Sequence, residues 1–355
     1  MHEALLYEKI TGGSGGEFLR CRLCSHYCTI PDGKSGTCNL RINNSGKLIT
    51  RSWGAADGAA IDPIEKKPFF HYKPNTRVLS FGSPGCNFRC LNCQNSHLSQ
   101  AYKTYSPNMN NTKLFTPVQI ADYAGKYQVD GIAYTYSEPT VFFEYARDTV
   151  LECRKRELLA GIFHVLVSNG YFSREMLDLS VEEHLFSAIN IDLKFMSEAK
   201  YRDICGAGLQ PVLDNIQRVH ALRDSIHLEI INLVIPGEND SDKDFEALAE
   251  FVASVSKDIP LHFNRFYPRH KMAGKEVTDS ARLIKAKEIA NKKGLKYVYI
   301  GNASLRGSEN TYCPNCNALL IERRYYEIES NVFEDLEPGA QAICPGCGEL
   351  VNVVV

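Results

Sequence analysis

The stretch FGSPGCNFRCLNC, residues 81–93, determines how this chain of 355 residues is interpreted. Its first residues close a short apolar run at 78–82, which predicts a strand. Cys86, Cys90 and Cys93 follow with the spacing CxxxCxxC and no fourth cysteine nearby in the sequence. Three thiolates can hold three irons of a [4Fe–4S] cube, which leaves the fourth iron open for a chelating ligand. Zinc is the alternative, although structural zinc usually has four protein ligands.

The sequence around this stretch predicts an α/β fold, because short apolar runs alternate with longer amphipathic stretches. We expect strands at 78–82, 131–135, 162–168, 188–193, 227–234 and 261–266, and an edge strand at 297–300. Helices are predicted at 117–127, 140–156, 211–222, 242–256 and 280–293. Six β/α units fit an open, partial (β/α)6 TIM-like barrel better than a closed barrel of eight.

Three units are predicted: a cysteine-rich N-terminal lobe (1–76), the barrel (77–302) and a zinc-ribbon-like C-terminal tail (303–355). The lobe offers four thiolates that fit zinc or an auxiliary iron–sulfur cluster, with His26 as a possible replacement ligand. They are Cys21, Cys24, Cys28 and Cys38. The tail has two CxxC pairs, typical of a tetrahedral zinc site, with rubredoxin-like iron as the second option. They are Cys313, Cys316, Cys344 and Cys347.

The composition limits the class of protein. Hydrophobic residues make up 44% and charged residues 23%, as is usual for a globular protein. The net charge of −2 excludes an overall basic field for nucleic acid. No apolar run is long enough to span a membrane, and the first residues lack a signal-peptide pattern, so we expect a cytoplasmic protein. The cytosol keeps thiols reduced, which favours metal binding over disulfides.

The central cysteine spacing, after the first strand of such a barrel, resembles the radical S-adenosylmethionine superfamily. The string SPGCNFRCLNCQN, with DPIEKKPFFHYKP upstream and SENTYCPNC downstream, is similar to the AmmeMemoRadiSam-system radical enzymes. These are related to pyruvate formate-lyase activating enzymes. The resemblance implies that the open iron binds S-adenosylmethionine and that an electron splits it to a 5′-deoxyadenosyl radical, which abstracts hydrogen. It also implies an electron donor such as flavodoxin or ferredoxin.

The barrel predicts functional residues where its strands end. After the second strand, Ser137-Glu138-Pro139 matches the family element that binds the methionine amino group. The alternative is a helix start, with Ser137 as the N-cap and Pro139 in the first helical position. After the third strand, Ser168 and Asn169 are expected to contact the ribose or the methionine carboxylate.

The remaining strands supply four more candidates. Asp192 and Lys194 match a DxK element and alternate to one face, so we predict that both point into the barrel as catalytic and cofactor-binding residues. A structural ion pair is the alternative. Asn232 in the fifth strand and His270 after the sixth are expected near the cofactor. The family often has an aromatic residue where this chain has Asn92, so adenine contact is expected from Phe88 or from later loops instead.

Two functional hypotheses follow. The first is a radical enzyme whose substrate is a small molecule, a modified nucleotide or a protein, as in glycyl-radical activation. The second is a zinc-binding scaffold without catalysis, which the terminal cysteine groups fit but Glu138, Asp192 and Lys194 do not. Cys153 is predicted to be buried in a helix and Cys205 to lie in a loop, and neither is assigned a role.

Overall fold

The computed structural model describes residues 2–11, 17–104 and 114–355, and at its centre is one eight-stranded sheet. The strand order is β14-β13-β12-β11-β10-β9-β8-β7. Strands β8 to β14 pair in parallel, and β7 pairs antiparallel with β8. The strands are β7 Asp57–Pro63, β8 Arg77–Gly82, β9 Gly131–Tyr134, β10 Phe163–Ser168, β11 Ala188–Asp192, β12 His227–Val234, β13 Leu261–Arg265 and β14 Val298–Gly301. β7 and β14 do not pair with each other, so the sheet is the expected open one.

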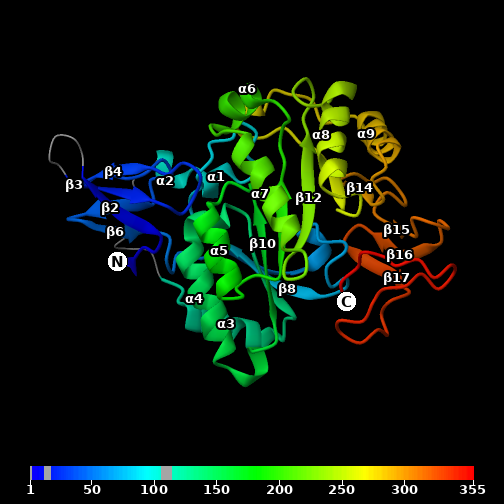
Figure 1. Ribbon diagram of the computed structural model, residues 1–355, viewed down its shortest axis with the longest axis horizontal. Helices are drawn as coiled ribbons and strands as arrows, with labels where there is room; N and C mark the ends of the chain where they lie inside the picture. The colour runs from blue at the N-terminus through cyan, green and yellow to red at the C-terminus, as the bar shows by residue number, and fades with distance from the viewer. Residues whose placement is uncertain (1, 12–16, 105–113) are drawn as a thin grey trace.

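Helices occupy the connections between the parallel strands, as right-handed crossovers require (Figure 1). The longer ones are α3 Pro117–Tyr127, α4 Phe143–Arg154, α5 Arg174–Glu182, α7 Gln210–Ala221, α8 Asp242–Val255 and α9 Ser280–Lys292. The short ones are α1 Ser96–Ser99, α2 Ala101–Thr104 and α6 Glu198–Lys200, the 3-10 turns η1 Ile64–Lys66, η3 Pro139–Phe142, η4 Glu157–Leu159 and η6 His270–Met272, and the π-helical turn η5 Tyr201–Cys205. Capping boxes at Thr116 and Ser241 begin α3 and α8.

The predicted α/β fold is confirmed, and each predicted barrel strand lies within one residue of an observed one. α5 and β7 are among the observed elements that were not predicted. α5 is a nine-residue helix whose N-cap, Ser173, accepts from Met176 N. β7 lies in the part of the sequence assigned to the N-terminal lobe, yet it extends the central sheet. The boundary at residue 76 therefore does not coincide with the edge of the barrel sheet.

The N-terminal lobe lies beside the barrel, at the left in Figure 1. It has two small antiparallel sheets, β2-β3-β4 and β1-β6-β5. Their strands are β1 His2–Glu3, β2 Tyr7–Thr11, β3 Glu17–Cys21, β4 Thr29–Pro31, β5 Arg41–Asn44 and β6 Lys47–Thr50. Leu19, Leu40 and Leu48 belong to the same buried apolar cluster as the barrel core, so the lobe and the barrel share one interior.

The C-terminal tail forms a further three-stranded sheet on the opposite side of the barrel (Figure 1). Its strands are β15 Thr311–Tyr312, β16 Leu319–Arg324 and β17 Glu327–Asn331. A second apolar cluster joins Phe70, Tyr297 and Tyr299 of the barrel to Leu320 and Val351 of the tail. None of the helices within the described ranges is long and apolar enough to cross a bilayer.

Candidate functional site

The three central cysteines line one cavity of 280 Å³ just beyond the end of β8. Phe88 N donates to Cys86 Sγ over 3.2 Å, and Cys93 Sγ lies 3.0 Å from Ser99 Oγ. Among the described residues, these three sulfur atoms are not a group whose members all lie within 4.8 Å of one another. Around a single zinc ion, bonds of about 2.3 Å place tetrahedral sulfurs about 3.8 Å apart. The wider spacing fits a cluster in which each thiolate binds a different iron.

A fourth thiol lies behind the site. Cys205 ends the π-helical turn η5, and its carbonyl accepts from Arg89 N at 2.8 Å. Its side chain hydrogen-bonds Cys90, and this bond, together with burial, raises the pKa of Cys90 well above its ordinary value. Cys205 is fully buried and does not line the cavity. The cavity itself therefore presents three thiols.

Glu138 lines the same cavity and is held by four hydrogen bonds. Its Oε1 accepts from Thr140 N (3.0 Å), Thr140 Oγ1 (2.6 Å) and Ser168 Oγ (2.8 Å). Its Oε2 accepts from Asn169 N at 2.8 Å. Burial raises the pKa of Glu138, and these hydrogen bonds oppose that rise. Glu138, in the loop after β9, thus fixes Ser168 and Asn169 at the end of β10.

The helix start at this position differs from the one considered in the sequence. Glu138, not Ser137, is the N-cap of η3, and Pro139 takes the first helical position. Ser137 instead donates to Ser83 O at 2.5 Å and thereby ties the loops after β8 and β9. Glu138 is favoured over Ser137 as the N-cap because its carboxylate oxygen also accepts from the Thr140 hydroxyl.

Asn169 connects the third strand to the cysteine motif. Its Nδ2 donates to Asn87 Oδ1 at 2.7 Å and lies 3.8 Å from Cys86 Sγ. Its Oδ1 accepts from Tyr171 N at 3.0 Å, which holds the amide in this orientation. Asn169 lines the cavity. Ser168 is connected to the cavity by its hydrogen bond to Glu138, which lines it.

Asp192 and Lys194 both line the cavity, on the side given by β11. Lys194 Nζ donates to Asp192 Oδ2 at 2.9 Å. Burial opposes its charge, but Asp192 and the Cys90 and Cys205 thiols raise the pKa of Lys194 well above its ordinary value. Lys194 is therefore a fixed cation at neutral pH.

Two other predicted residues lie away from the cavity wall. Asn232 is buried behind the wall, and its Nδ2 donates to the carbonyls of Leu193 (2.7 Å) and Lys194 (3.3 Å). It supports the Asp192–Lys194 strand end. His270 is exposed in η6, where it lines a different, larger cavity together with Arg89. A sequence pattern does not reveal which of the two cavities His270 lines.

The segment between β7 and β8 contributes residues that the strand-end argument missed. Lys66, Lys67 and Pro68 line the cavity, and Lys67 is almost completely buried. Its Nζ donates to Asp62 Oδ2 (2.6 Å) and Tyr136 Oη (3.2 Å) and lies 4.5 Å from the centre of the Tyr136 ring. The string DPIEKKPFFHYKP was a signal for these residues, but it carries no spacing rule that would place them.

The residues present fit an iron–sulfur cluster with a zwitterionic, purine-bearing ligand. The cavity offers three thiols, the cation Lys194 and the carboxylate of Glu138, whose Oε2 accepts from Asn169 N and has lone-pair capacity for another hydrogen bond. Phe88 and Asn92 also line it, and Asn92 Oδ1 is buried without a partner among the residues that the structure describes. An unpaired buried acceptor is costly and is satisfied by a ligand donor such as an exocyclic amine.

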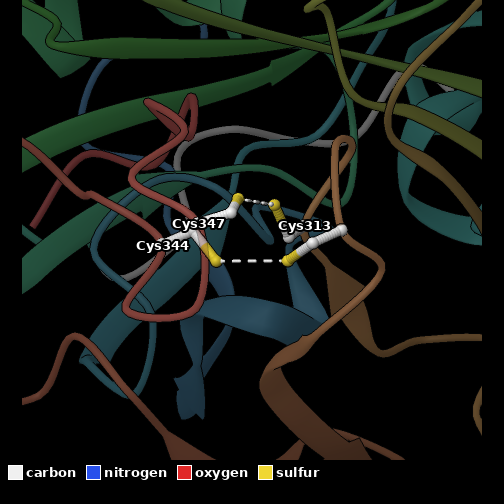
Figure 2. A group of neighbouring side chains, drawn as sticks. Cys313, Cys344 and Cys347 are labelled. Carbon is white, nitrogen blue, oxygen red and sulfur yellow. Dashed lines mark hydrogen bonds between the residues drawn. The ribbon is translucent and has the colours of Figure 1, made fainter.

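The tail cysteines form a separate, compact group (Figure 2). The sulfur atoms of Cys313 and Cys347 lie 3.6 Å apart, and those of Cys316 and Cys344 lie 3.7 Å apart. All four lie within 4.8 Å of one another, which matches the spacing of about 3.8 Å around one tetrahedral ion. This group fits a single metal ion with no open position.

The lobe cysteines are arranged differently. Cys21 and Cys24 are buried, whereas Cys28 and Cys38 are partly exposed. His26 Nε2 donates to Asn87 O of the barrel motif at 3.0 Å. This nitrogen is therefore not placed to replace a lobe cysteine as a metal ligand. Cys153 is buried in α4, as predicted.

Comparison with known proteins identifies relatives that cover all or part of this chain. Residues 81–252 match the model of the radical SAM superfamily. An uncharacterized protein of Methanocaldococcus jannaschii is 39% identical over the full length of both chains. A putative glycyl-radical enzyme activating enzyme of the same organism is 30% identical, covering 62% of this chain and 77% of that protein. A domain of pyruvate-formate lyase-activating enzyme from Bacteroides vulgatus is 22% identical over 48% of this chain and 99% of its own, with a TM-score of 0.39.

Proposed function

We propose, from the premise that this chain belongs to the radical S-adenosylmethionine superfamily, that the cavity beyond β8 is its active site. The chain is a radical enzyme that works by cleaving S-adenosylmethionine. When bound, the cluster supplies one electron to the sulfonium, and the resulting 5′-deoxyadenosyl radical abstracts a hydrogen atom from the substrate. The observation that carries the assignment is that three thiols, Glu138 and the Asp192–Lys194 pair line one cavity.

Different residues of the cavity would hold different parts of the cluster and of S-adenosylmethionine. Cys86, Cys90 and Cys93 would bind three irons. Glu138 Oε2 would accept from the methionine ammonium, and the Lys194 ammonium would receive its carboxylate. Support for this division comes from the opposite charges of the two groups and from the fact that both line the cavity.

The remaining predicted contacts are assigned by position. Phe88 and Asn92 would contact the adenine, and Ser168 and Asn169 would position the ribose side. Asn232 would act through the strand end that it supports. His270 is not assigned to this cavity, because it lines another one.

The test of this assignment is the triple variant Cys86→Ala/Cys90→Ala/Cys93→Ala. Anaerobically reconstituted wild-type protein should form 5′-deoxyadenosine when reduced in the presence of S-adenosylmethionine, and the triple variant should form none. The tail metal should remain in both proteins, which serves as the folding control. Unchanged 5′-deoxyadenosine formation in the triple variant would contradict the assignment.

For the substrate, we propose a protein that carries the abstracted hydrogen on a glycine, as in activating enzymes. Support comes from the named relative at 30% identity. A flavodoxin or ferredoxin in the cytoplasm would supply the electron, since clustered free thiols require a reducing compartment. The tail site would hold zinc and stabilise the fold.

The substrate proposal is tested with extract from cells grown on deuterated glycine. The extract is separated into a protein fraction and a small-molecule filtrate, and each is incubated anaerobically with the reduced enzyme. Deuterium should enter 5′-deoxyadenosine from the protein fraction. Transfer from the filtrate alone would assign a small-molecule substrate instead.

A further inference from the structure

We propose that the four cysteines of the N-terminal lobe hold a second [4Fe–4S] cluster, which passes electrons to the barrel cluster. This inference goes beyond the radical chemistry of the barrel and concerns how that chemistry receives its electron. The four cysteines are Cys21, Cys24, Cys28 and Cys38.

The sulfur atoms of the lobe are spaced like those of the central cysteines and more widely than those of the tail. Throughout residues 2–11, 17–104 and 114–355, the tail group alone brings three or more ligand atoms within 4.8 Å of one another. No three of the lobe sulfurs are that close. The lobe thus shares the wider spacing of Cys86, Cys90 and Cys93, and that spacing suits thiolates that each bind a different iron.

The second argument is the set of donors that face these sulfurs. Arg41 is fully buried, and its Nη1 donates to Cys21 Sγ at 3.1 Å. Thr37 N lies 3.4 Å from Cys28 Sγ, and Thr37 Oγ1 lies 3.3 Å from it. Hydrogen bonds to cluster sulfurs are one of the means by which proteins set the reduction potential of an iron–sulfur centre. The lobe therefore holds its thiolates with donors already in place.

The third argument is the direct contact between the lobe cysteines and the barrel motif. Cys24 forms a β-bridge with Phe172, next to the loop that carries Asn169. Two residues later, His26 Nε2 donates to the carbonyl of Asn87, which follows Cys86 in the chain. A path through Ser25, His26 and Asn87, with one hydrogen bond, thus joins a lobe cysteine to a cysteine of the barrel.

The backbone of the motif accommodates this contact at Gly85. Its φ is +110°, and a Cβ there would collide with the side chain of Leu40, two residues beyond Cys38. The absence of a side chain lets the lobe lie directly against the turn that precedes Cys86. The two cysteine groups are neighbours because this position is a glycine.

The difference in exposure among the thiols indicates the direction in which electrons would move along this path. Cys28 and Cys38 are partly exposed, whereas Cys24 and Cys86 are buried. Thr37 and Asn39, on either side of Cys38, line a cavity of 980 Å³ together with Arg89 of the barrel motif. A low-potential one-electron donor, such as reduced flavodoxin, would be oxidised by one electron at this outer side. The lobe cluster would be reduced from 2+ to 1+, and the same electron would then reduce the barrel cluster.

The identity of the metal is tested in the triple variant that lacks Cys86, Cys90 and Cys93, because its lobe is intact. After anaerobic reconstitution, it should contain about four irons and show the EPR signal of a reduced [4Fe–4S] cluster, while wild type contains about eight irons. An iron-free triple variant with two zinc ions per chain would overturn the proposal. Cys316→Ser, in the tail, is the matched control and should leave the iron content unchanged.

The electron path is tested in the quadruple variant with Ala at the four lobe positions. Its flavodoxin-driven cleavage of S-adenosylmethionine should fall by at least about tenfold, while dithionite-driven cleavage persists. Persisting dithionite activity shows that the barrel is folded and separates this result from a failure of the proposed radical function. Cys28→Ala is measured in parallel as a milder variant and should lower the same ratio of rates. Equal flavodoxin-driven rates in wild type and both variants would refute the relay.

Discussion

Glu138 shows at the scale of one residue how structure and cofactor binding are combined. Its carboxylate caps η3, fixes Ser168 and Asn169, and still lines the cavity. A group that satisfies three donors on one oxygen is held in one rotamer before any ligand arrives. The second oxygen, with one hydrogen bond, is the one we propose to accept from the methionine ammonium.

We predict that Glu138→Gln weakens both stability and cofactor binding. The amide nitrogen cannot accept, so at least one buried donor among Thr140, Ser168 and Asn169 loses its partner, at a cost of about 1–3 kcal/mol. Urea unfolding and calorimetric titration with S-adenosylmethionine measure the two effects. Unchanged affinity in a variant that is destabilised would show that Glu138 serves the fold alone.

His164 makes a residue-scale prediction about pH. It is buried in the sheet, 3.1 Å from Tyr134 Oη, and burial, with Arg154 adding, lowers its pKa from 6.5 to about 3. Because the folded-state pKa is depressed, His164 contributes stability above pH 6.5 that is lost as the pH falls toward 3. The free energy of unfolding should therefore fall by up to about 1.4 kcal/mol per pH unit from this group.

The check is to compare wild type with His164→Gln by urea unfolding between pH 7 and pH 5. The wild-type free energy should fall more steeply than that of the variant. His184→Gln, at an exposed site, serves as the control. Parallel curves for wild type and His164→Gln would contradict the assignment.

At the scale of elements, the connection between β7 and β8 is what completes the cavity. It runs through η1 and brings Lys66, Lys67 and Pro68 to the lining of the cavity. Asn190 Nδ2 of β11 donates to Pro68 O at 2.5 Å, which fixes the segment inside the barrel. Two lysines on one carboxylate, Asp62, leave a net positive charge at this wall.

A pair of variants tests this element. Lys67→Met removes a buried ammonium from Asp62, and we expect a loss of about 1–3 kcal/mol, reduced from the full cost of a broken buried pair because Lys66 remains. Lys66→Met, on the half-exposed neighbour 2.7 Å from the same carboxylate, should cost less than about 1 kcal/mol. Urea unfolding of both variants measures the difference, and equal losses would show that burial does not distinguish the two lysines.

At the scale of the whole molecule, the barrel carries a cysteine group on either side. The tail packs on Phe70, Tyr297 and Tyr299 through an apolar cluster that includes Cys313 and Cys344 themselves. His71 Nδ1 also donates to Asn352 O at 2.5 Å. The tail cysteines Cys313 and Cys344 thus pack in the same apolar cluster as these barrel residues.

We therefore predict that Cys344→Ala removes the tail metal and lowers the melting temperature of the whole protein, since a structural metal contributes its binding free energy to folding. Differential scanning calorimetry and metal analysis of the purified protein measure both. Cys153→Ala, a buried cysteine outside the three groups, is the control for the loss of a thiol alone. Loss of the metal with normal melting would mean that the tail site does not stabilise the fold.

The amino-acid sequence by itself determined the strands of the barrel and indicated which cysteines are grouped as candidate metal ligands. The alternation of apolar runs and amphipathic stretches is a local property, so the barrel strands and helices such as Pro117–Tyr127 followed from it. The CxxxCxxC and CxxC spacings are equally local, because the ligands of one turn lie a few residues apart. Sequence patterns also placed Glu138, Asp192 and Lys194 at strand ends, where the cavity lies.

The tertiary structure alone decided which residues meet across long distances in the chain. Lys67 and Tyr136 are 69 residues apart and share a hydrogen bond, and His26 reaches Asn87 across 61 residues. It also turned His270 away from the cavity and gave the lobe cysteines a wider spacing than those of the tail. Such contacts depend on how layers pack and how loops close, and neither leaves a periodic pattern in the sequence.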